Sequence, residues 1–345
     1  MVNFVKRLIQ MNNNIPISLL ELAFITEGSN AKATFQKTKE LAQLADNLGY
    51  NRFWLAEHHN MAHVASTATV VLIGYIASQT QNIRVGSGGI MLPNHSPLII
   101  AEQFGTLETL YPNRIDLGLG RAPGTDSLTA QAIREDFYEQ SQRFPKNVQA
   151  IHDYFSPDNA AAKVRAFPAE GTNVPIWILG SSMDSASLAA AKGLPYAFAG
   201  HFAPRMMLQA FEFYRENFIP SKYLSSPKTM ACVNAIGADT NEEAEVLSTT
   251  LYQMFLGLIR NNRKPMQPPL ASLEGLMSEE EKFHVDQMTA CTFTGSKEKL
   301  EKDLKQLIDY SRIDELMITS PIFDHQDKMK SLKILKEVID NINKA

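Results

Sequence analysis

The sequence has few cysteines, little net charge and no long apolar run. Its two cysteines, Cys232 and Cys291, lie far apart and form no CxxC pair, which excludes a disulfide framework and a cysteine-based zinc site and favours the reducing cytoplasm. A formal net charge of -4 over 345 residues argues against nucleic acid or an anionic membrane surface as a partner. No apolar stretch reaches the roughly 18 residues of a transmembrane helix.

Several catalytic and nucleotide-binding motifs are also missing. The chain has no GxSxG elbow, no Walker loop and no HExxH motif. The glycine run at 118–124 is not a dinucleotide fingerprint, because its spacing is wrong and no acidic residue follows at the ribose position. A doubly wound sheet is therefore the less favoured alternative for the fold.

The first residues are expected to lie outside the folded part. Met1 to Gln10 carry Lys6 and Arg7 but no sustained apolar core or cleavage site, so they are not a signal peptide. A polar Asn12-Asn13-Asn14 run follows. We expect residues 1–14 to be a disordered extension and residues 15–345 to form a single domain.

What the chain does have is a regular alternation of short apolar runs and longer helical patterns, which is typical of parallel βαβ units. Eight such units in one chain predict an α/β fold of the (β/α)8 TIM-barrel type. The predicted strands cover residues 17–23, 52–57, 83–90, 114–121, 175–180, 195–200, 230–237 and 315–320. The clearest helical patterns cover residues 34–48, 97–110, 182–192, 242–256 and 328–343, with Gly49 and Gly193 as C-terminal stops.

Two connections are too long for simple barrel turns, and we expect them to be insertions at the C-terminal face. Residues 122–172 include a plausible fourth helix. Residues 258–296 contain three prolines and an acidic run at 279–281, and are predicted to form a lid rather than a disordered loop.

Titratable residues collect where the second predicted strand ends, at Glu57, His58 and His59. Adjacent residues at a strand end point to opposite faces, so the two histidines cannot easily share one metal ion. The pattern favours one working imidazole and no metal site. The alternative is a histidine pair that only caps the strand with hydrogen bonds.

Glycines interrupt the third predicted strand at Gly86, Gly88 and Gly89. Glycine inside a buried strand costs stability unless the backbone must approach something closely. We expect contact with a flat ligand here, the alternative being a bulge or a glycine required by barrel packing.

A second polar group combines Arg121 with the turn Gly180-Ser181-Ser182 and Ser185. A guanidinium, hydroxyls and the amides of a helix N-terminus together suit a phosphate monoester. Taken singly, Ser182 is explained as a helix N-cap and Arg121 by pairing with Asp126. His95, between two prolines, is predicted to be structural, whereas His201 either lines the substrate pocket or faces solvent.

These residues resemble the bacterial-luciferase-like family of flavin-dependent monooxygenases, and in particular its single-subunit branch. The segments that carry the resemblance are WLAEHHN at 54–60, VGSGGIMLPNHSP at 85–97, AEQFGTLE at 101–108 and RIDLGLGRAPGTD at 114–126. They cover the first third of the chain strongly and the rest more weakly.

The resemblance implies a barrel that binds FMN, receives it reduced from a separate reductase and reacts it with O2 to give a flavin hydroperoxide, which oxygenates a small organic substrate. It implies that His58 is the catalytic base and that Glu57 orients the groups around it. Gly88 and Gly89 resemble the family's non-proline cis peptide under the flavin ring.

By the same resemblance, Arg121, Ser181, Ser182 and Ser185, with Gly180, hold the flavin phosphate, although luciferase has a glutamate in place of Ser181. Gly120 stands where luciferase has a reactive cysteine, so we do not expect efficient light emission from long-chain aldehydes.

Two alternatives to this function stay open at the level of sequence. The protein could be a related enzyme that binds a deazaflavin and transfers hydride without oxygen, or a flavin-binding protein that has lost turnover. The family resemblance and the apolar stretches at 70–76 and 98–104 indicate a homodimer. The substrate is not indicated by any motif.

Overall fold

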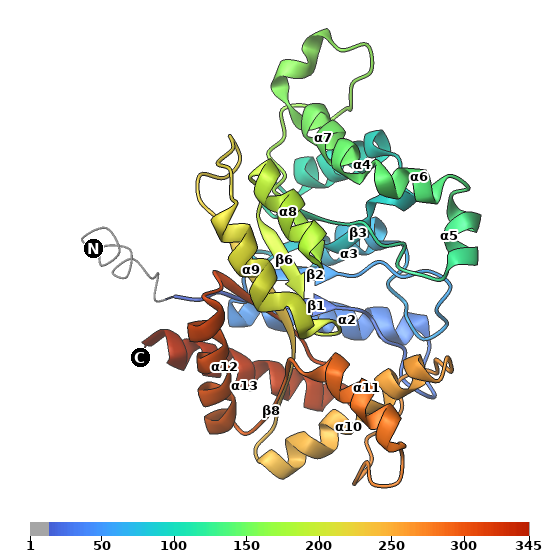
Figure 1. Ribbon diagram of the computed structural model, residues 1–345, viewed down its shortest axis with the longest axis vertical. Coiled ribbons are helices and arrows are strands. Elements are labelled where there is room, and N and C mark those ends of the chain that lie inside the picture. Colours follow the sequence, from blue (N-terminus) through green and yellow to red (C-terminus); the bar gives the residue numbers. More distant parts are fainter. Residues whose placement is uncertain (1–13, 345) are drawn as a thin grey trace.

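The computed structural model describes residues 14–344. Nearly all of the expected N-terminal extension, residues 1–13, lies outside the described residues. Eight parallel strands form the centre of the molecule (Figure 1). They are β1 (Ile17–Glu21), β2 (Arg52–Leu55), β3 (Arg84–Met91), β4 (Ile115–Gly120), β5 (Ile176–Gly180), β6 (Tyr196–Ala199), β7 (Thr229–Gly237) and β9 (Glu315–Thr319).

These strands close into a barrel. Their order is β6-β5-β4-β3-β2-β1-β9-β7, and a further pairing of β6 with β7 joins the two ends of the sheet. The predicted (β/α)8 TIM barrel is thereby confirmed, with all eight strands at the predicted places in the sequence.

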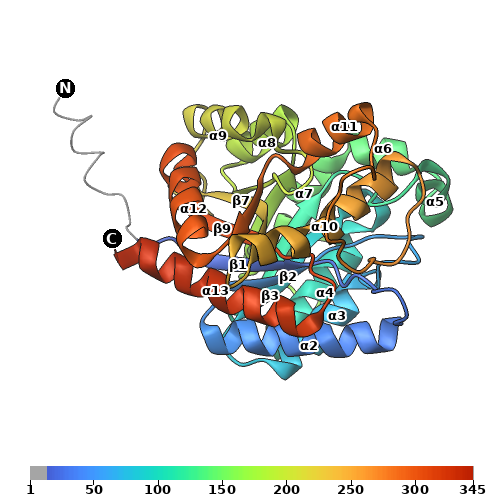
Figure 2. The same cartoon turned by 90° about the horizontal axis from the view of Figure 1, so that it is seen from below.

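Helices surround the barrel on its outside. They are α2 (Ala31–Leu48), α3 (Thr69–Gln79), α4 (Pro97–Leu110), α7 (Phe144–Phe155), α8 (Met183–Lys192), α9 (Met207–Glu216), α10 (Asn241–Ile259), α12 (Lys297–Ser311) and α13 (His325–Lys344). Figure 2 shows α2 and α13 on one side of the barrel and α8 and α9 on the opposite side. Within residues 14–344, no helix is both long and apolar enough to cross a membrane.

Alternation along the strands produces two apolar cores. In β2, Phe53 and Leu55 face the helices, while Trp54 points into the barrel. There the Trp54 ring meets the Trp177 ring edge to face, with centroids 5.6 Å apart. The barrel interior is therefore filled, and a ligand can approach only from the strand ends.

Helix ends follow local sequence signals. The side chain of Asn30 accepts a hydrogen bond from the Ala33 amide and so begins α2, which ends at Gly49 with φ 75°. Gly193 ends α8 in the same left-handed conformation. Both glycines were predicted as stops, and both are confirmed.

A buried ionic network lies at the opposite, N-terminal end of the strands. Arg52 donates to Asp116 at 2.5 Å and to Glu315 at 2.9 Å, and Arg84 donates to the other oxygen of Asp116 at 2.7 Å. The network joins β2, β3, β4 and β9 at the end of the barrel that lies away from the site described below. Its charges are tolerated there because each is paired with a charge of opposite sign.

The two long connections contain more regular structure than expected. Residues 122–172 hold α5 (Ser127–Ile133) and α6 (Phe137–Gln142) before α7; in Figure 1, α5 and α6 lie at the right and α7 lies near the top. Residues 258–296 hold α11 (Glu279–Thr289) and a ninth strand, β8 (Thr292–Gly295), which pairs with the end of β7. The sequence analysis did not predict this strand, because its four residues, three half-buried and one buried, include a single apolar side chain and so carry little strand signal.

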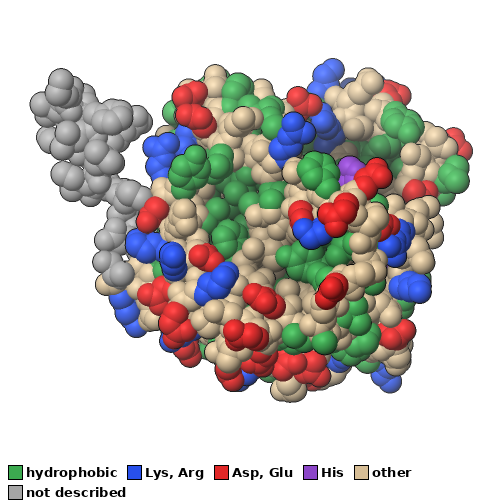
Figure 3. Space-filling model, turned by 60° about the horizontal axis from the view of Figure 1, so that its bottom comes forward, with side chains coloured by type: hydrophobic (Ala, Val, Ile, Leu, Met, Phe, Trp, Pro, Cys, Tyr) green, Lys and Arg blue, Asp and Glu red, His purple; other side chains and the backbone are tan. Residues whose placement is uncertain are grey.

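Charges of both signs are interspersed on the face seen in Figure 3, with apolar patches between them.

Candidate active site

All ten predicted site residues line one cavity at the C-terminal ends of the strands. We call it the inner cavity; its volume is about 500 Å³. The ten residues are Glu57, His58, Gly88, Gly89, Gly120, Arg121, Gly180, Ser181, Ser182 and Ser185. They come from β3, β4 and β5, from the turns that follow β2, β4 and β5, and from the first turn of α8 (Ser185). The structure thus brings together residues that lie up to 128 positions apart (185 - 57 = 128).

Glu57 is a buried hydrogen-bond acceptor at the wall of this cavity. His59 and His95 each donate from Nε2 to its Oε1 at 2.9 Å, and the Met91 amide donates to its Oε2 at 3.1 Å. Burial alone would raise the pKa of Glu57, but these hydrogen bonds lower it to about 2. Glu57 is therefore ionised and fixes both neighbouring imidazoles.

Glu57 contacts several of the groups around it. It accepts hydrogen bonds from the side chains of His59, His95 and Asn94, and it makes none to His58 among the described residues. The structural prediction for His95 agrees with its contact to Glu57.

His58 lies just beyond the end of β2 and lines the inner cavity. Its Nδ1 is 3.2 Å from the Gly124 carbonyl oxygen, so a proton on Nδ1 is donated to that carbonyl and Nε2 is left as the basic nitrogen. Burial lowers the pKa of His58. A neutral imidazole at neutral pH is able to accept a proton.

The peptide bond between Gly88 and Gly89 is cis, as expected. A Cβ atom on Gly88 would lie 2.7 Å from Leu20 Cδ1, and one on Gly89 would lie 2.7 Å from the Gly118 carbonyl oxygen. The backbone of β4 therefore excludes a side chain at Gly89, whereas a side chain at Gly88 would require Leu20 to move. Both glycines leave the backbone facing the cavity.

Gly86 does not share this role, so the expected ligand contact is wrong there. It does not line the inner cavity, and a Cβ on it would lie 2.5 Å from the Asp116 carbonyl oxygen. Barrel packing against β4, which was the alternative explanation, accounts for this glycine.

The predicted phosphate group is assembled at the N-terminus of α8. Ser182 caps that helix in a reciprocal capping box with Ser185. A helix N-cap was the alternative explanation of Ser182 in the sequence analysis. The Ser185 hydroxyl also lies 2.9 Å from the Tyr196 hydroxyl. Arg121 donates to Asp184 at 3.2 Å, and its side chain is 51% exposed.

The suggested pairing of Arg121 with Asp126 is wrong. Asp126 instead accepts from the Thr129 amide at 3.0 Å and caps α5. The guanidinium of Arg121 consequently stays beside the N-terminal amides of α8, where an anion would be bound.

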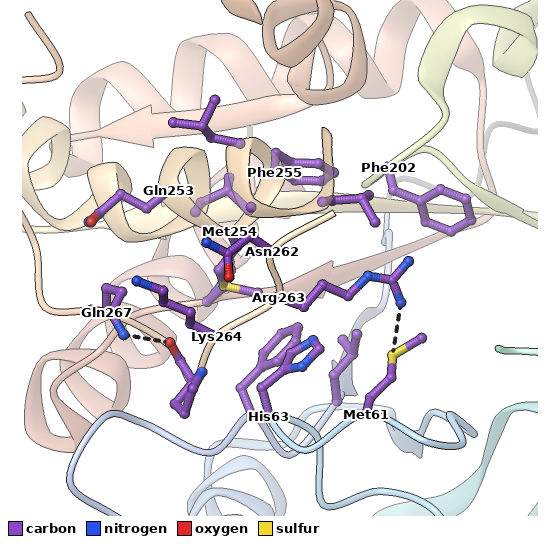
Figure 4. A pocket seen from close by; sticks show the side chains of 18 of the residues that line it. Met61, His63, Phe202, Gln253, Met254, Phe255, Asn262, Arg263, Lys264 and Gln267 are labelled. Carbon is purple, nitrogen blue, oxygen red and sulfur yellow. Dashed lines mark hydrogen bonds between the residues drawn. The ribbon is translucent and has the colours of Figure 1, made fainter. Parts of the chain in front are cut away.

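A second cavity, of about 450 Å³, adjoins the first (Figure 4). We call it the outer cavity. Its walls come from α10, from the segment 260–267 and from the turns after β1, β2 and β6. Four residues line both cavities: Leu22, His58, His201 and Phe202. His58 therefore stands where the occupants of the two cavities would meet.

His201 lines both cavities, so its pocket-lining alternative is the correct one. Burial, followed by the nearby charge of His58, lowers its pKa to about 3. The sequence analysis missed His63 and Arg263, which also line the outer cavity. His63 is an isolated histidine in a turn, and Arg263 lies in a proline-rich connection. Neither belongs to a periodic pattern in the sequence, so their place at the cavity is seen only in the folded structure.

Comparison with known proteins agrees with this geometry. Residues 16–309 match the family model for "Luciferase-like monooxygenase". The chain is 46% identical over 331 residues to a "Luciferase-like monooxygenase" of Escherichia coli (strain K12), which covers 96% of this chain and 99% of that protein. It is 31% identical to the "N-acetyl-S-alkylcysteine monooxygenase" of Bacillus subtilis (strain 168), with 94% and 98% of the two chains covered.

Solved structures share the fold. The crystal structure of apo-MsnO8 has a TM-score of 0.89 at 33% identity and covers 95% of this chain and 99% of its own. Below 25% identity the likeness concerns the fold alone. Two examples are an FMN complex of the oxygenating constituent of 3,6-diketocamphane monooxygenase from Pseudomonas putida, with a TM-score of 0.70, and an F420-dependent secondary alcohol dehydrogenase, with a TM-score of 0.68. By its sequence over most of its length and by its structure, this chain belongs to the luciferase-like monooxygenase family.

Proposed function

We propose that this protein is the oxygenase component of a two-component system that takes reduced FMN from a separate reductase and uses O2 to oxygenate a small organic substrate. The observation that carries the proposal is the junction of two cavities at His58, one suited to a flat phosphorylated ring system and the other mainly apolar. The reducing cytoplasm is the expected location.

The inner cavity fits FMN in size and in the distribution of its groups. Ligand pockets for small molecules and cofactors commonly measure about 300–1,000 Å³, and this one has about 500 Å³. The cis Gly88-Gly89 backbone and Gly120 would lie against the flat ring. Arg121, Ser181 and Ser182 would hold the phosphate at the N-terminus of α8.

When bound, reduced FMN supplies two electrons to O2, and the protein controls water and protons around this chemistry. The interior below the cavity is apolar, with Leu20, Trp54, Cys232 and Met317 in its walls, so bulk water is excluded there. His58 would hold or accept a proton at Nε2, since its Nδ1 is occupied by the Gly124 carbonyl.

The substrate is a matter for direct testing. Because a relative at 31% identity is named N-acetyl-S-alkylcysteine monooxygenase, N-acetyl-S-benzylcysteine is a suitable first substrate to test. The alternative of a deazaflavin-dependent hydride transfer draws support from the shared fold of F420-dependent enzymes, an alcohol dehydrogenase and a tetrahydromethanopterin reductase, both below 25% identity. The non-catalytic alternative is disfavoured by the presence of both Glu57 and His58.

Anaerobic titration distinguishes these alternatives. Purified protein would be titrated with reduced FMN and, separately, with reduced F420, followed by exposure to O2 and analysis of products from N-acetyl-S-benzylcysteine and a panel of thioethers, ketones and aldehydes. We expect preferential binding of reduced FMN and incorporation of one atom from ¹⁸O2 into a product. Preference for F420 would replace this proposal with hydride transfer, and binding without turnover of any panel member would favour the non-catalytic alternative.

A further inference from the structure

The outer cavity has an unusual charge for a protein with a formal net charge of -4. Its described lining residues include no aspartate or glutamate but three cationic side chains, Arg260, Arg263 and Lys264. Arg260 is neutralised by Glu281 at 2.6 Å. Within residues 14–344, neither Arg263 nor Lys264 has a carboxylate within 4.0 Å, so two positive charges remain uncompensated at this cavity.

Neighbouring imidazoles add unused hydrogen-bonding capacity. Nδ1 of His63 is buried and has no hydrogen-bond partner among the described residues, and the same holds for Nδ1 of His201. Arg263 extends across the cavity near Met61 and His63 (Figure 4), and its guanidinium lies 3.6 Å from the sulfur of Met61. A guanidinium that contacts only a thioether can bind an anion without breaking an ion pair.

The remainder of the cavity is apolar. Apolar side chains from α10, from the turn after β1 and from the turn after β6 line the cavity together with the cations and His58. They include Phe24, Phe202, Leu251, Met254, Phe255 and Leu258. The cavity therefore offers an apolar chamber with positive charge at one side.

We propose that the outer cavity binds a substrate with an apolar body and a carboxylate group, and that Arg263 binds the carboxylate, with His63 and Lys264 beside it. A guanidinium matches a carboxylate with two parallel hydrogen bonds, whereas a neutral amide or ester gains no comparable interaction. The apolar body then extends toward His58 and the inner cavity. This assignment names the substrate class and rests on the proposed function, in which the substrate occupies the outer cavity.

The test uses a matched pair of probes that differ only in charge. The full-length protein, without flavin, is titrated by calorimetry with 4-phenylbutanoate and with 4-phenylbutanamide. We expect the acid to bind at least about tenfold more tightly than the amide. In Arg263→Gln this preference is lost while amide binding is unchanged. In Arg263→Lys, which keeps the charge but not the paired donors, acid binding weakens by about threefold and part of the preference remains.

The control is Lys302→Gln, which removes one exposed charge on α12, away from both cavities. It should leave the preference for the acid unchanged. Equal binding of acid and amide by the wild-type protein, no binding of either at millimolar concentration, or a preference that survives Arg263→Gln in a protein with unaltered melting temperature would each overturn the assignment. Because no flavin is present, these outcomes are independent of whether the protein oxygenates anything.

Discussion

Three imidazoles line the outer cavity, two of them at its junction with the inner cavity, and each has a lowered pKa. Burial is the main cause at His58, His63 and His201, and the charge of Arg263 contributes at His58 and His63. Neutral imidazoles therefore persist here at pH values at which exposed histidines are protonated. At the scale of the residue, this environment keeps the three imidazoles uncharged near neutral pH, so each retains a nitrogen lone pair that is able to accept a proton.

Replacement of His58 tests its role as a base. We expect His58→Asn to reduce single-turnover product formation by about 10²- to 10⁴-fold while reduced FMN still binds, since general acid-base groups contribute that much. In the wild-type protein the rate should not decline at pH 6.5, the ordinary pKa of histidine, but only at a lower pH. The reason is that burial lowers the pKa of His58. The control is His284→Asn, an exposed histidine on α11. Full activity of His58→Asn would eliminate the assignment.

Arg121 can be tested with two flavins. The phosphate distinguishes FMN from riboflavin, so Arg121→Gln should weaken FMN binding by about tenfold or more and leave riboflavin binding unchanged. Fluorescence titration of both flavins provides the measurement, with riboflavin as the internal control. A variant that loses both flavins equally would show that Arg121 shapes the cavity instead of binding phosphate.

At the scale of the element, the helices and strands that can be predicted from the sequence are those with a clear pattern of apolar residues. The helix at 97–110 was predicted at its observed bounds, α4, because Pro97 fixes its first turn and an apolar face follows. β8 was missed although β2 and β6 are equally short, because Phe293 is the one apolar side chain in β8, whereas β2 has three and β6 has four. Cavity-lining residues at strand ends could be predicted from their position, whereas Arg263 could not, because its place at the outer cavity depends on how a long connection folds back.

That connection is attached to the barrel at Met266. The Met266 amide donates to the Ile25 carbonyl at 2.9 Å, and the Glu27 amide donates to the Met266 carbonyl at 2.8 Å. The Met266 side chain is buried. These contacts hold the segment over the outer cavity, as a cover of the site requires.

Loosening this attachment should expose the site to water. We expect Met266→Pro, which lacks the amide donor, to raise hydrogen peroxide released per flavin oxidised by at least about twofold, because an open site allows reduced oxygen to escape before it reacts with substrate. Met266→Leu keeps the amide and the volume and serves as the control. The hypothesis that residues 258–296 act as a lid fails if both variants release peroxide as the wild type does.

At the scale of the whole molecule, one apolar surface remains exposed over α3 and α4. Val71 is 70% exposed and Ile99 is 47% exposed, and both belong to the stretches that the sequence analysis associated with a homodimer. A second copy of the chain would remove these side chains from water.

Light scattering can test the proposed dimer. A charge at the centre of this surface, in the double variant Val71→Glu/Ile99→Glu, should shift the mass from that of a dimer to that of a monomer, because two carboxylates would be buried in the interface. Leu128→Glu is the matched control, since Leu128 is 80% exposed on α5, outside this surface. A wild-type protein that already has the mass of a single chain would refute the dimer.

The two cavities are lined by different parts of the chain. The inner cavity is built mainly by strand ends that precede residue 200, whereas most of the outer cavity comes from one stretch, residues 251–267. Relatives could therefore acquire new substrates by changing a short piece of sequence without altering how the cofactor is held. For the same reason, exchange of this one stretch between family members is a practical route to enzymes of altered scope.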